Sequence, residues 1–360
     1  MGNRVQYVVT ERLGSRVRAK SIRQLRYRDW DPVRKKRKTK MKKLMFAIAA
    51  AAAGTVLADV SSANVVGYQT VTIPAQQQTM IGVQFQGIGG ESISVQDLFP
   101  DPLGQGCFTG AASVSKAGDA DQLAYWDINE NGHYVYLYLN NTTSTSEVNK
   151  KRRNKWCVVD MQSKLSPAAK AFWGSNGEAS IAKLQPGMGL WLIRKNYATP
   201  TNVTMAGQVT VAQSGLSIAL RTGQNMFTCG FTQPFAPNPD VAYNDESKRI
   251  DWLAKECVGA ASVSKAGDAD QLSFWDINEN GHYVYLYLNN TTSTSEVNKK
   301  RKGHWCVVDM QSRLSPEAKA FWGSNGEASP AVIPAGRGVW YIRNAASTNF
   351  VLTLDQPYSL

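Results

Sequence analysis

The sequence has few of the residues on which metal-ion and nucleophilic chemistry depends. Its 360 residues include three histidines and five cysteines, and no two cysteines have the C-x-x-C spacing. A zinc site or a redox-active dithiol is therefore not expected. The chain also lacks a G-x-S-x-G motif, and acids such as Asp160, Glu147 and Glu178 lie in no recognisable catalytic motif. Since hydrolysis needs a nucleophile beside a base or a spaced pair of carboxylates, we expect a protein that is not an enzyme.

Long apolar runs and an excess charge on the main part of the chain are also missing. After residue 58 no stretch approaches the roughly 18 apolar residues that a membrane-spanning helix needs. The formal charge of +12 comes from residues 1–58, which hold 16 basic and 3 acidic residues, whereas the rest holds 24 basic and 25 acidic residues. Because the body is neutral, nucleic acid is not expected as a partner.

The segment 41–58, MKKLMFAIAAAAAGTVLA, has the parts of a secretory signal peptide. Two lysines precede an alanine-rich apolar stretch, and a small-residue cleavage site ends at Ala58, with a second candidate site after Ala63. The mature chain is expected to begin at Asp59 or Asn64 and to be periplasmic, cell-surface or extracellular. Residues 1–40 are interpreted as mis-assigned upstream sequence, with an unusually long basic start of the signal as the alternative.

The main part of the chain is an internal duplication. Residues 110–180 recur at 259–329 with 7 differences in 71 positions, and the closing PGMGLW of the first copy returns 149 residues later as AGRGVW. A period of this length indicates a duplicated domain and not a solenoid. The sequence predicts one module at 59–200 and its duplicate at 201–360. Two copies of one surface favour a bivalent or structural role over a single catalytic pocket.

Short runs of β-branched and aromatic residues, separated by Gly, Asn and Pro, predict an all-β fold of two tandem β-sandwich-like modules. In the first module the predicted strands lie at 65–73, 79–86, 122–128, 133–141, 155–161, 189–195 and 201–209. Each module has one predicted short helix, at 166–173 and 315–322, with a Ser cap, a Pro at its first position and a Gly at its end. The polar, basic stretches 142–155 and 291–304 predict long exposed loops.

Three spaced motifs carry a resemblance to known proteins: N-V-V-G-Y after the signal peptide, a central D-x-L-x-x-W-D…Y-x-Y, and a closing P-G-x-G-x-W-x-I-R. The pattern resembles uncharacterised secreted β-repeat proteins of Gram-negative bacteria and covers nearly the whole chain after Met41. The second module departs from it, because it lacks the N-V-V-G-Y form and carries Ala335 beside the proline. The resemblance implies export and a β fold, and it assigns no catalytic residue.

The segment 133–139, HYVYLYL, alternates with a period of two. One face of this strand therefore carries Val135, Leu137 and Leu139, which belong in the core. The other face carries a row of tyrosines, Tyr134, Tyr136 and Tyr138, repeated in the second copy as Tyr283, Tyr285 and Tyr287. Exposed tyrosine rows can stack on sugar rings, and ordinary cross-strand aromatic packing is the favoured alternative.

A calcium-loop motif, D-x-[DN]-x-[DN]-G, overlaps the turn before each tyrosine row. The candidate ligands are Asp127, Asn129 and Asn131 in the first copy and Asp276, Asn278 and Asn280 in the second. An EF-hand is excluded, because the twelfth position is a tyrosine and the flanks are strands. We favour a β-hairpin whose Asn-Gly forms a type I′ turn, with Ca²⁺ as the weaker interpretation and no other cofactor.

Cys157 and Cys306 occupy matching places in the two copies, and Cys107 and Cys257 match to within one residue. Cys107 with Cys157, and Cys257 with Cys306, would each close a loop of about 50 residues and stabilise the fold by roughly 3–4 kcal/mol. Exported compartments permit such disulfides. Buried thiols are the alternative, and the unmatched Cys229 could compete for Cys257.

The remaining feature is a basic cluster that is repeated in both copies: Lys150, Lys151, Arg152, Arg153 and Lys155, matched by Lys299, Lys300, Arg301, Lys302 and His304. Such a cluster can hold anionic polysaccharide or nucleic acid electrostatically, but a solvated loop is the favoured interpretation because the body of the chain is neutral. The first hypothesis is a secreted or cell-surface, non-catalytic tandem β-module protein with a structural or adhesive role, whose partner is a cell-surface polymer or polysaccharide. A bivalent carbohydrate-binding protein that uses the tyrosine rows comes second, and a glycoside hydrolase-like enzyme third.

Overall fold

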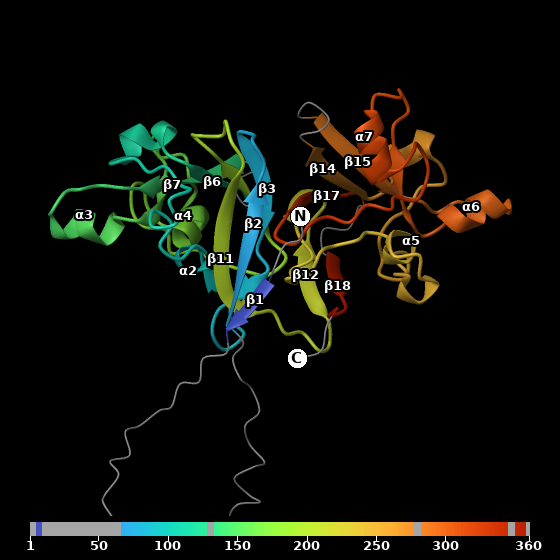
Figure 1. The fold of residues 1–360 in the computed structure, drawn as a ribbon, viewed down its shortest axis with the longest axis horizontal. Coiled ribbons are helices and arrows are strands. Elements are labelled where there is room, and N and C mark those ends of the chain that lie inside the picture. Colours follow the sequence, from blue (N-terminus) through green and yellow to red (C-terminus); the bar gives the residue numbers. More distant parts are fainter. Residues whose placement is uncertain (1–4, 9–65, 128–132, 277–281, 345–349, 358–360) are drawn as a thin grey trace, which may run out of the picture. The chain divides into compact units, whose positions relative to one another are not determined.

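The computed structural model describes residues 5–8, 66–127, 133–276, 282–344 and 350–357 (Figure 1). The signal peptide and its cleavage sites lie outside the described residues, so they stay predictions. Within the described ranges, no helix has the length and apolar character to cross a membrane.

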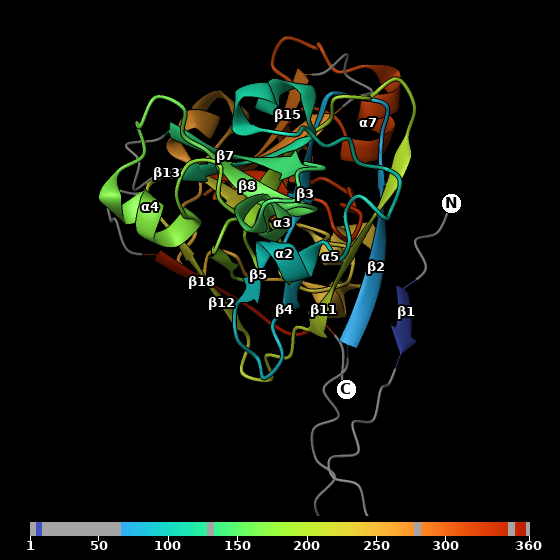
Figure 2. The same ribbon diagram turned by 90° about the vertical axis from the view of Figure 1, so that its left-hand side faces the viewer.

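The first copy is built on two antiparallel sheets. Among the described residues, one sheet has the strand order β3-β10-β6-β7-β8 and the other the order β1-β2-β11-β4, while β5 pairs with β9. The long neighbours β2 and β11 run side by side over eight residue pairs (Figures 1 and 2). The strands are β1 (Val5–Val8), β2 (Val66–Ile73), β3 (Gln78–Gly82), β4 (Phe85–Gln86), β5 (Ile93–Ser94), β6 (Gln122–Asp127), β7 (His133–Asn140), β8 (Lys155–Val159), β9 (Lys183–Leu184), β10 (Gly189–Ile193) and β11 (Thr201–Val209).

The second copy repeats this plan. In the part of the chain that the structure describes, its larger sheet has the order β13-β17-β14-β15-β16, and β12 pairs with β18 as β2 pairs with β11. The predicted all-β fold is therefore confirmed. Because β11 pairs with β2 and β4, the first copy extends through Val209 and does not end at residue 200. The strands are β12 (Leu216–Leu220), β13 (Gly223–Phe227), β14 (Gln271–Asp276), β15 (His282–Leu288), β16 (Trp305–Val308), β17 (Val339–Arg343) and β18 (Phe350–Leu354).

The two predicted helices are present as α4 (Pro167–Trp173) and α7 (Pro316–Trp322). Ser166 and Ser315 cap them, and Gly174 and Gly323 end them. The prediction of a single helix per module is wrong, because the basic stretches predicted as loops contain α3 (Glu147–Arg152) and α6 (Glu296–Arg301), which are also capped by serines. The other helical turns are α2 (Val95–Leu98), α5 (Pro239–Ala242), η1 (Val114–Asp119), η3 (Glu246–Lys248) and η4 (Val263–Asp268).

Strand alternation decides what each face of the larger sheet buries. On β7 the side chains of Val135, Leu137 and Leu139 are almost fully buried, as predicted. On β8 the neighbouring residues Trp156 and Cys157 point to opposite faces. Trp156 packs edge-on against Phe99 and Phe108, whereas Cys157 joins a separate cluster beneath η1. Each larger sheet is therefore covered on both faces at this end.

Candidate functional site

The tyrosine rows, on β7 and β15, are the first candidate site, and their C-terminal ends are buried. Tyr138 and Tyr287 are each 1% exposed, because η1 and η4 cover them with small side chains such as Ala117 and Ala266. Their hydroxyls accept hydrogen bonds of 2.8 Å from the Asn140 and Asn289 amides. The prediction that these two tyrosines belong to an exposed sugar-stacking row is therefore wrong.

The other end of each row lies in a cluster to which both copies contribute, here called the inter-copy cluster. Its buried centre consists of Met80, Ala124, Trp191, Met226 and Trp340, and Trp126, Tyr134, Tyr136, Trp275 and Tyr283 pack against it. Trp126 of the first copy meets Trp340 of the second edge-to-face at 6.3 Å. Burial raises the pKa of both Tyr134 and Tyr283. In the middle of the rows Tyr136 is half-buried, like Tyr134 and Tyr283, whereas Tyr285 is 37% exposed.

The backbone contacts beside this cluster are reciprocal. Two glycine loops, residues 187–189 and 336–338, each precede a strand of the larger sheet in their own copy and contact the edge strand of the other copy. The Gly82 N–H donates to the Gly336 carbonyl at 2.9 Å, and the Thr228 N–H donates to the Gly187 carbonyl at 2.9 Å. Antiparallel bridges join Ile81 to Arg337 and Met188 to Phe227 in the same way. Such an exchange of equivalent contacts is the geometry of a two-fold interface, here within one chain.

The glycines of these loops are required by this close approach. Gly187 and Gly336 have φ values of 98° and 79°, a conformation that side chains disfavour. A Cβ at Gly336 would lie 2.2 Å from Val71 Cγ2, and one at Gly187 would lie 2.7 Å from Ile218, the corresponding residue of the other copy. The G-x-G motif therefore serves the contact between the copies and not a ligand.

Replacing Gly336 by Ala tests this role. Because the new Cβ collides with β2 of the first copy and the positive φ is strained, we expect the free energy of unfolding to fall by about 1–3 kcal/mol. Gly267→Ala is the matched control, since a Cβ there meets nothing within 4 Å. Denaturant unfolding measures both variants, and equal stabilities would contradict the assignment.

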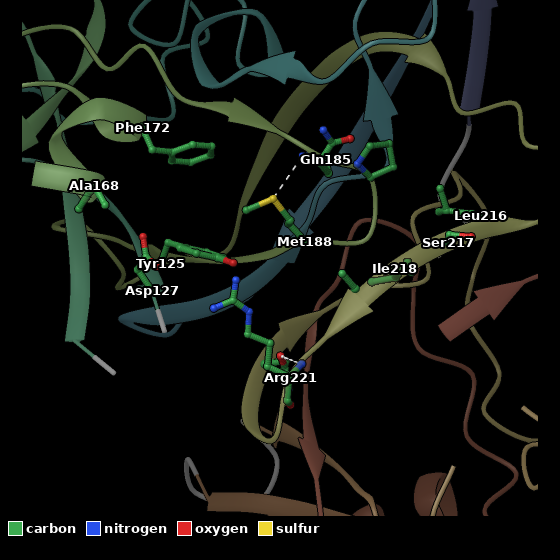
Figure 3. Close-up of a pocket in the computed structure, with 14 residues that line it drawn as sticks. Tyr125, Asp127, Ala168, Phe172, Gln185, Met188, Leu216, Ser217, Ile218 and Arg221 are labelled. Carbon is green, nitrogen blue, oxygen red and sulfur yellow. Dashed lines mark hydrogen bonds between the residues drawn. The ribbon is translucent and has the colours of Figure 1, made fainter. Parts of the chain in front are cut away.

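A cavity of about 440 Å³ lies between α4 of the first copy and β12 with the turn that follows it in the second (Figure 3). Tyr125 and Phe172 line it from the first copy, and Arg221 extends toward Tyr125 and Asp127 from the second. Burial, and to a smaller extent nearby Asp127, raise the pKa of Tyr125 to about 12, while Arg221 opposes the shift. The cavity combines aromatic faces, a guanidinium group and a carboxylate.

Different side chains occupy the matching position in the second copy. Phe274 replaces Tyr125, and Arg337 replaces Met188. The Arg337 guanidinium lies 5.5 Å from the centre of the Phe274 ring. Burial lowers the pKa of Arg337 to about 10. Sequence reasoning missed this asymmetry, although Tyr125 and Ala168, which line the cavity, are among the 7 positions at which the repeated segments differ.

Of the calcium candidates, the structure describes only the aspartates. Asp127 Oδ2 accepts a hydrogen bond from Trp173 Nε1 at 3.1 Å, and Asp276 Oδ2 accepts one from Trp322 Nε1 at 2.8 Å. Both carboxylates thus anchor a helix, α4 or α7, to the sheet. Asn129, Asn131, Asn278 and Asn280 lie outside the described residues.

The hairpins are confirmed, since Asp127 pairs with His133 and Asp276 with His282. Within the described ranges no three His, Cys, Asp or Glu side chains form a metal-binding group.

The predicted disulfides are absent: all five cysteines are free thiols. Cys257 packs in the core beside Trp305, whereas Cys306 lies in the cluster of Tyr287 on the opposite face of the sheet. Alternation along β16 therefore keeps the thiol of Cys306 away from that of Cys257. Burial raises the pKa of Cys157 and Cys306 to about 12, and that of Cys107 and Cys257 to about 11.

We therefore expect five titratable thiols when the purified protein is denatured without reductant. Native protein should react slowly, since burial keeps the thiols protonated. The ordinary thiol pKa is 9.0 and the folded value for Cys157 is about 12, so the native state binds more protons between these pH values. The free energy of unfolding should fall as the pH rises from 9 to 12. A count of one free thiol in denaturant would instead support the two disulfides that the sequence predicts.

A buried charge network in the second copy also escaped the sequence analysis. Asp270 is fully buried and accepts hydrogen bonds from Arg343 Nη1 at 2.6 Å and from the Tyr341 hydroxyl at 2.7 Å. Asp270 also accepts the backbone N–H groups of Val258 and Asn344, as Asp121 of the first copy accepts those of Thr109 and Lys195. These buried carboxylates hold loops and strands in place.

The chain matches no protein-family model, no curated protein and no solved structure. The functional interpretation therefore depends on the residues and their geometry.

Proposed function

We propose that this is an exported, non-catalytic protein with a structural or adhesive role, in which two β modules act as one unit. The proposal rests on the reciprocal contact of the glycine loops, because this contact uses the duplicated segments to join the two modules. Two repeated features of the sequence, one end of each tyrosine row and the G-x-G loops, contribute to the contact between the copies.

The buried carboxylates support the same proposal. Asp160 Oδ1 accepts the backbone N–H groups of Lys164 and Leu165, and Asp309 repeats the arrangement with Arg313 and Leu314. Asp127 and Asp276 hold tryptophan side chains. Each of these acids has a structural hydrogen-bonding role, as expected of a framework.

Export and lack of catalysis are tested together. The chain from Met41 is expressed in a Gram-negative host, and the secreted protein is sequenced from its N-terminus and incubated with a panel of polysaccharides. We expect a start at Asp59 or Asn64 and no release of reducing ends. Secreted protein that retains residues 41–58, or protein that stays inside the cell, would contradict the export proposal, and hydrolysis of any polysaccharide would contradict the non-catalytic one.

Carbohydrate binding is the second candidate, and the cavity beside Tyr125 favours it. Phe172, which lines it, is 39% exposed, and in the centre of the tyrosine rows Tyr285 is exposed and Tyr136 is half-buried. Aromatic rings of this kind can stack on the apolar face of a sugar ring.

Two alanine variants separate these surfaces. If the cavity binds sugar, Phe172→Ala should weaken retention on insoluble polysaccharide by about 1 kcal/mol, the scale of an aromatic contact. Phe321→Ala, at the matching position of α7, should not weaken it. If the rows bind sugar, Tyr136→Ala with Tyr285→Ala should abolish retention while the fold persists by circular dichroism. A parent protein that no polysaccharide retains would exclude both surfaces.

A further inference from the structure

The basic surface around α3 carries more lysine and arginine side chains than the neighbouring acidic side chains can pair with. Lys150 Nζ lies 2.7 Å from Glu147 in an exposed pair, and the half-buried Arg152 lies 3.8 Å from the exposed Glu178. Lys151, Arg153 and Lys155 are exposed and make no ion pair within the described residues. The helix projects from the sheet of its own copy (Figure 1). Exposed pairs of this kind are weak, so this surface keeps its positive potential.

The second copy repeats this surface around α6 and adds to it. Lys299 pairs with Glu296 at 2.9 Å, while Lys300 and Lys302 are exposed. Arg249, from the loop after η3, donates from Nη2 to the Lys302 carbonyl at 2.7 Å and brings one more guanidinium to the surface. A hollow of about 670 Å³ lies here, lined by Arg249, Lys299, Lys300 and Arg301, with Glu246 and Glu327 as its exposed acids.

The floor of this hollow contains a buried pair of ionisable side chains. His304 Nε2 lies 2.7 Å from Asp240 Oδ2, and both side chains are about 5% exposed or less. His304 Nδ1 and Asp240 Oδ1 have no hydrogen-bond partner in the described part of the chain. The matching residue of the first copy is Lys155, so this pair belongs to the second copy.

The chemistry of the two surfaces narrows the class of partner. Single-stranded nucleic acid binding uses accessible aromatic rings for stacking, but the adjacent Trp156 and Trp305 are fully buried. Membrane insertion needs a broad apolar face, whereas α3 and α6 each expose a single valine, Val148 and Val297. Closely spaced cations with hydroxyl and amide groups nearby suit a hydrated polymer of anionic sugars.

We propose that the α3 and α6 surfaces bind one anionic polysaccharide at two points. Its repeating carboxylate or sulfate groups meet Lys151 and Arg153 on one surface and Lys300, Lys302 and Arg249 on the other. Because both surfaces belong to one chain, binding at the first raises the effective concentration of polymer at the second. The inference rests on the proposed adhesive role and names its partner class.

The test measures binding of the mature chain to immobilised polygalacturonate and to dextran sulfate. One triple variant neutralises the first surface (Lys150→Gln, Lys151→Gln, Arg153→Gln), and its match neutralises the second (Lys299→Gln, Lys300→Gln, Lys302→Gln). We expect each to weaken binding about tenfold and their combination to weaken it more than a hundredfold. Raising the salt from 50 to 200 mM should weaken the parent about tenfold or more, as release of counterions requires. Trigalacturonate, which has only three carboxylates, should bind far more weakly than the polymer.

The control removes the same charge elsewhere, with Lys116→Gln, Lys164→Gln and Lys183→Gln, which are exposed in the first copy. It should bind like the parent. Equal loss in the control, undiminished binding by the combined variant, or stronger binding to single-stranded DNA or anionic vesicles would overturn the proposal. Those results would leave the structural role intact, because that role is tested by export and by the absence of hydrolysis.

Discussion

The backbone contact between each glycine loop and the edge strand of the other copy is the constraint on which the rest of the structure depends. The loops approach so closely that a Cβ at Gly189 would lie 3.0 Å from the Phe227 nitrogen, and one at Gly338 would lie 2.8 Å from Met80. Only glycine permits this distance and the positive φ of the preceding glycine. Once the loops are in place, the tryptophans that follow them, Trp191 and Trp340, are brought into the inter-copy cluster.

The contact between the copies determines which of the repeated side chains stay accessible. In a two-fold interface each residue must fit both its own copy and the equivalent surface of the other. The tyrosine rows therefore lose most of their accessible area, one end to a 3-10 helix and the other to the inter-copy cluster. Two features are found in only one place because the copies differ there: the cavity between Tyr125 and Arg221, and the Asp240–His304 pair. The basic helices stay outside the interface and remain free to meet a partner.

Local patterns in the sequence predicted local structure well. The period of two placed Val135, Leu137 and Leu139 in the core, and the Ser-Pro start with a closing Gly located α4. The same rules could not show that η1 covers Tyr138, since that contact joins segments about 20 residues apart through the fold. The disulfide prediction failed for a related reason: similar spacing in two copies indicates homology, while pairing needs the side chains to share a face. That information was partly present, because Trp156 and Cys157 are adjacent on one strand and cannot both face the core beside Phe108.

The central claim is that the two copies form one cooperative unit through the glycine loops, and native-state hydrogen exchange tests it most directly. The amides of Gly82, Thr228 and Gly338 donate across the interface, so their exchange reports the free energy of separating the copies. We predict that these three amides are protected as strongly as those in the middle of β7 and β15. Exchange at the rate of exposed loops, while β7 and β15 stay protected, would mean that the copies fold independently and would contradict the account.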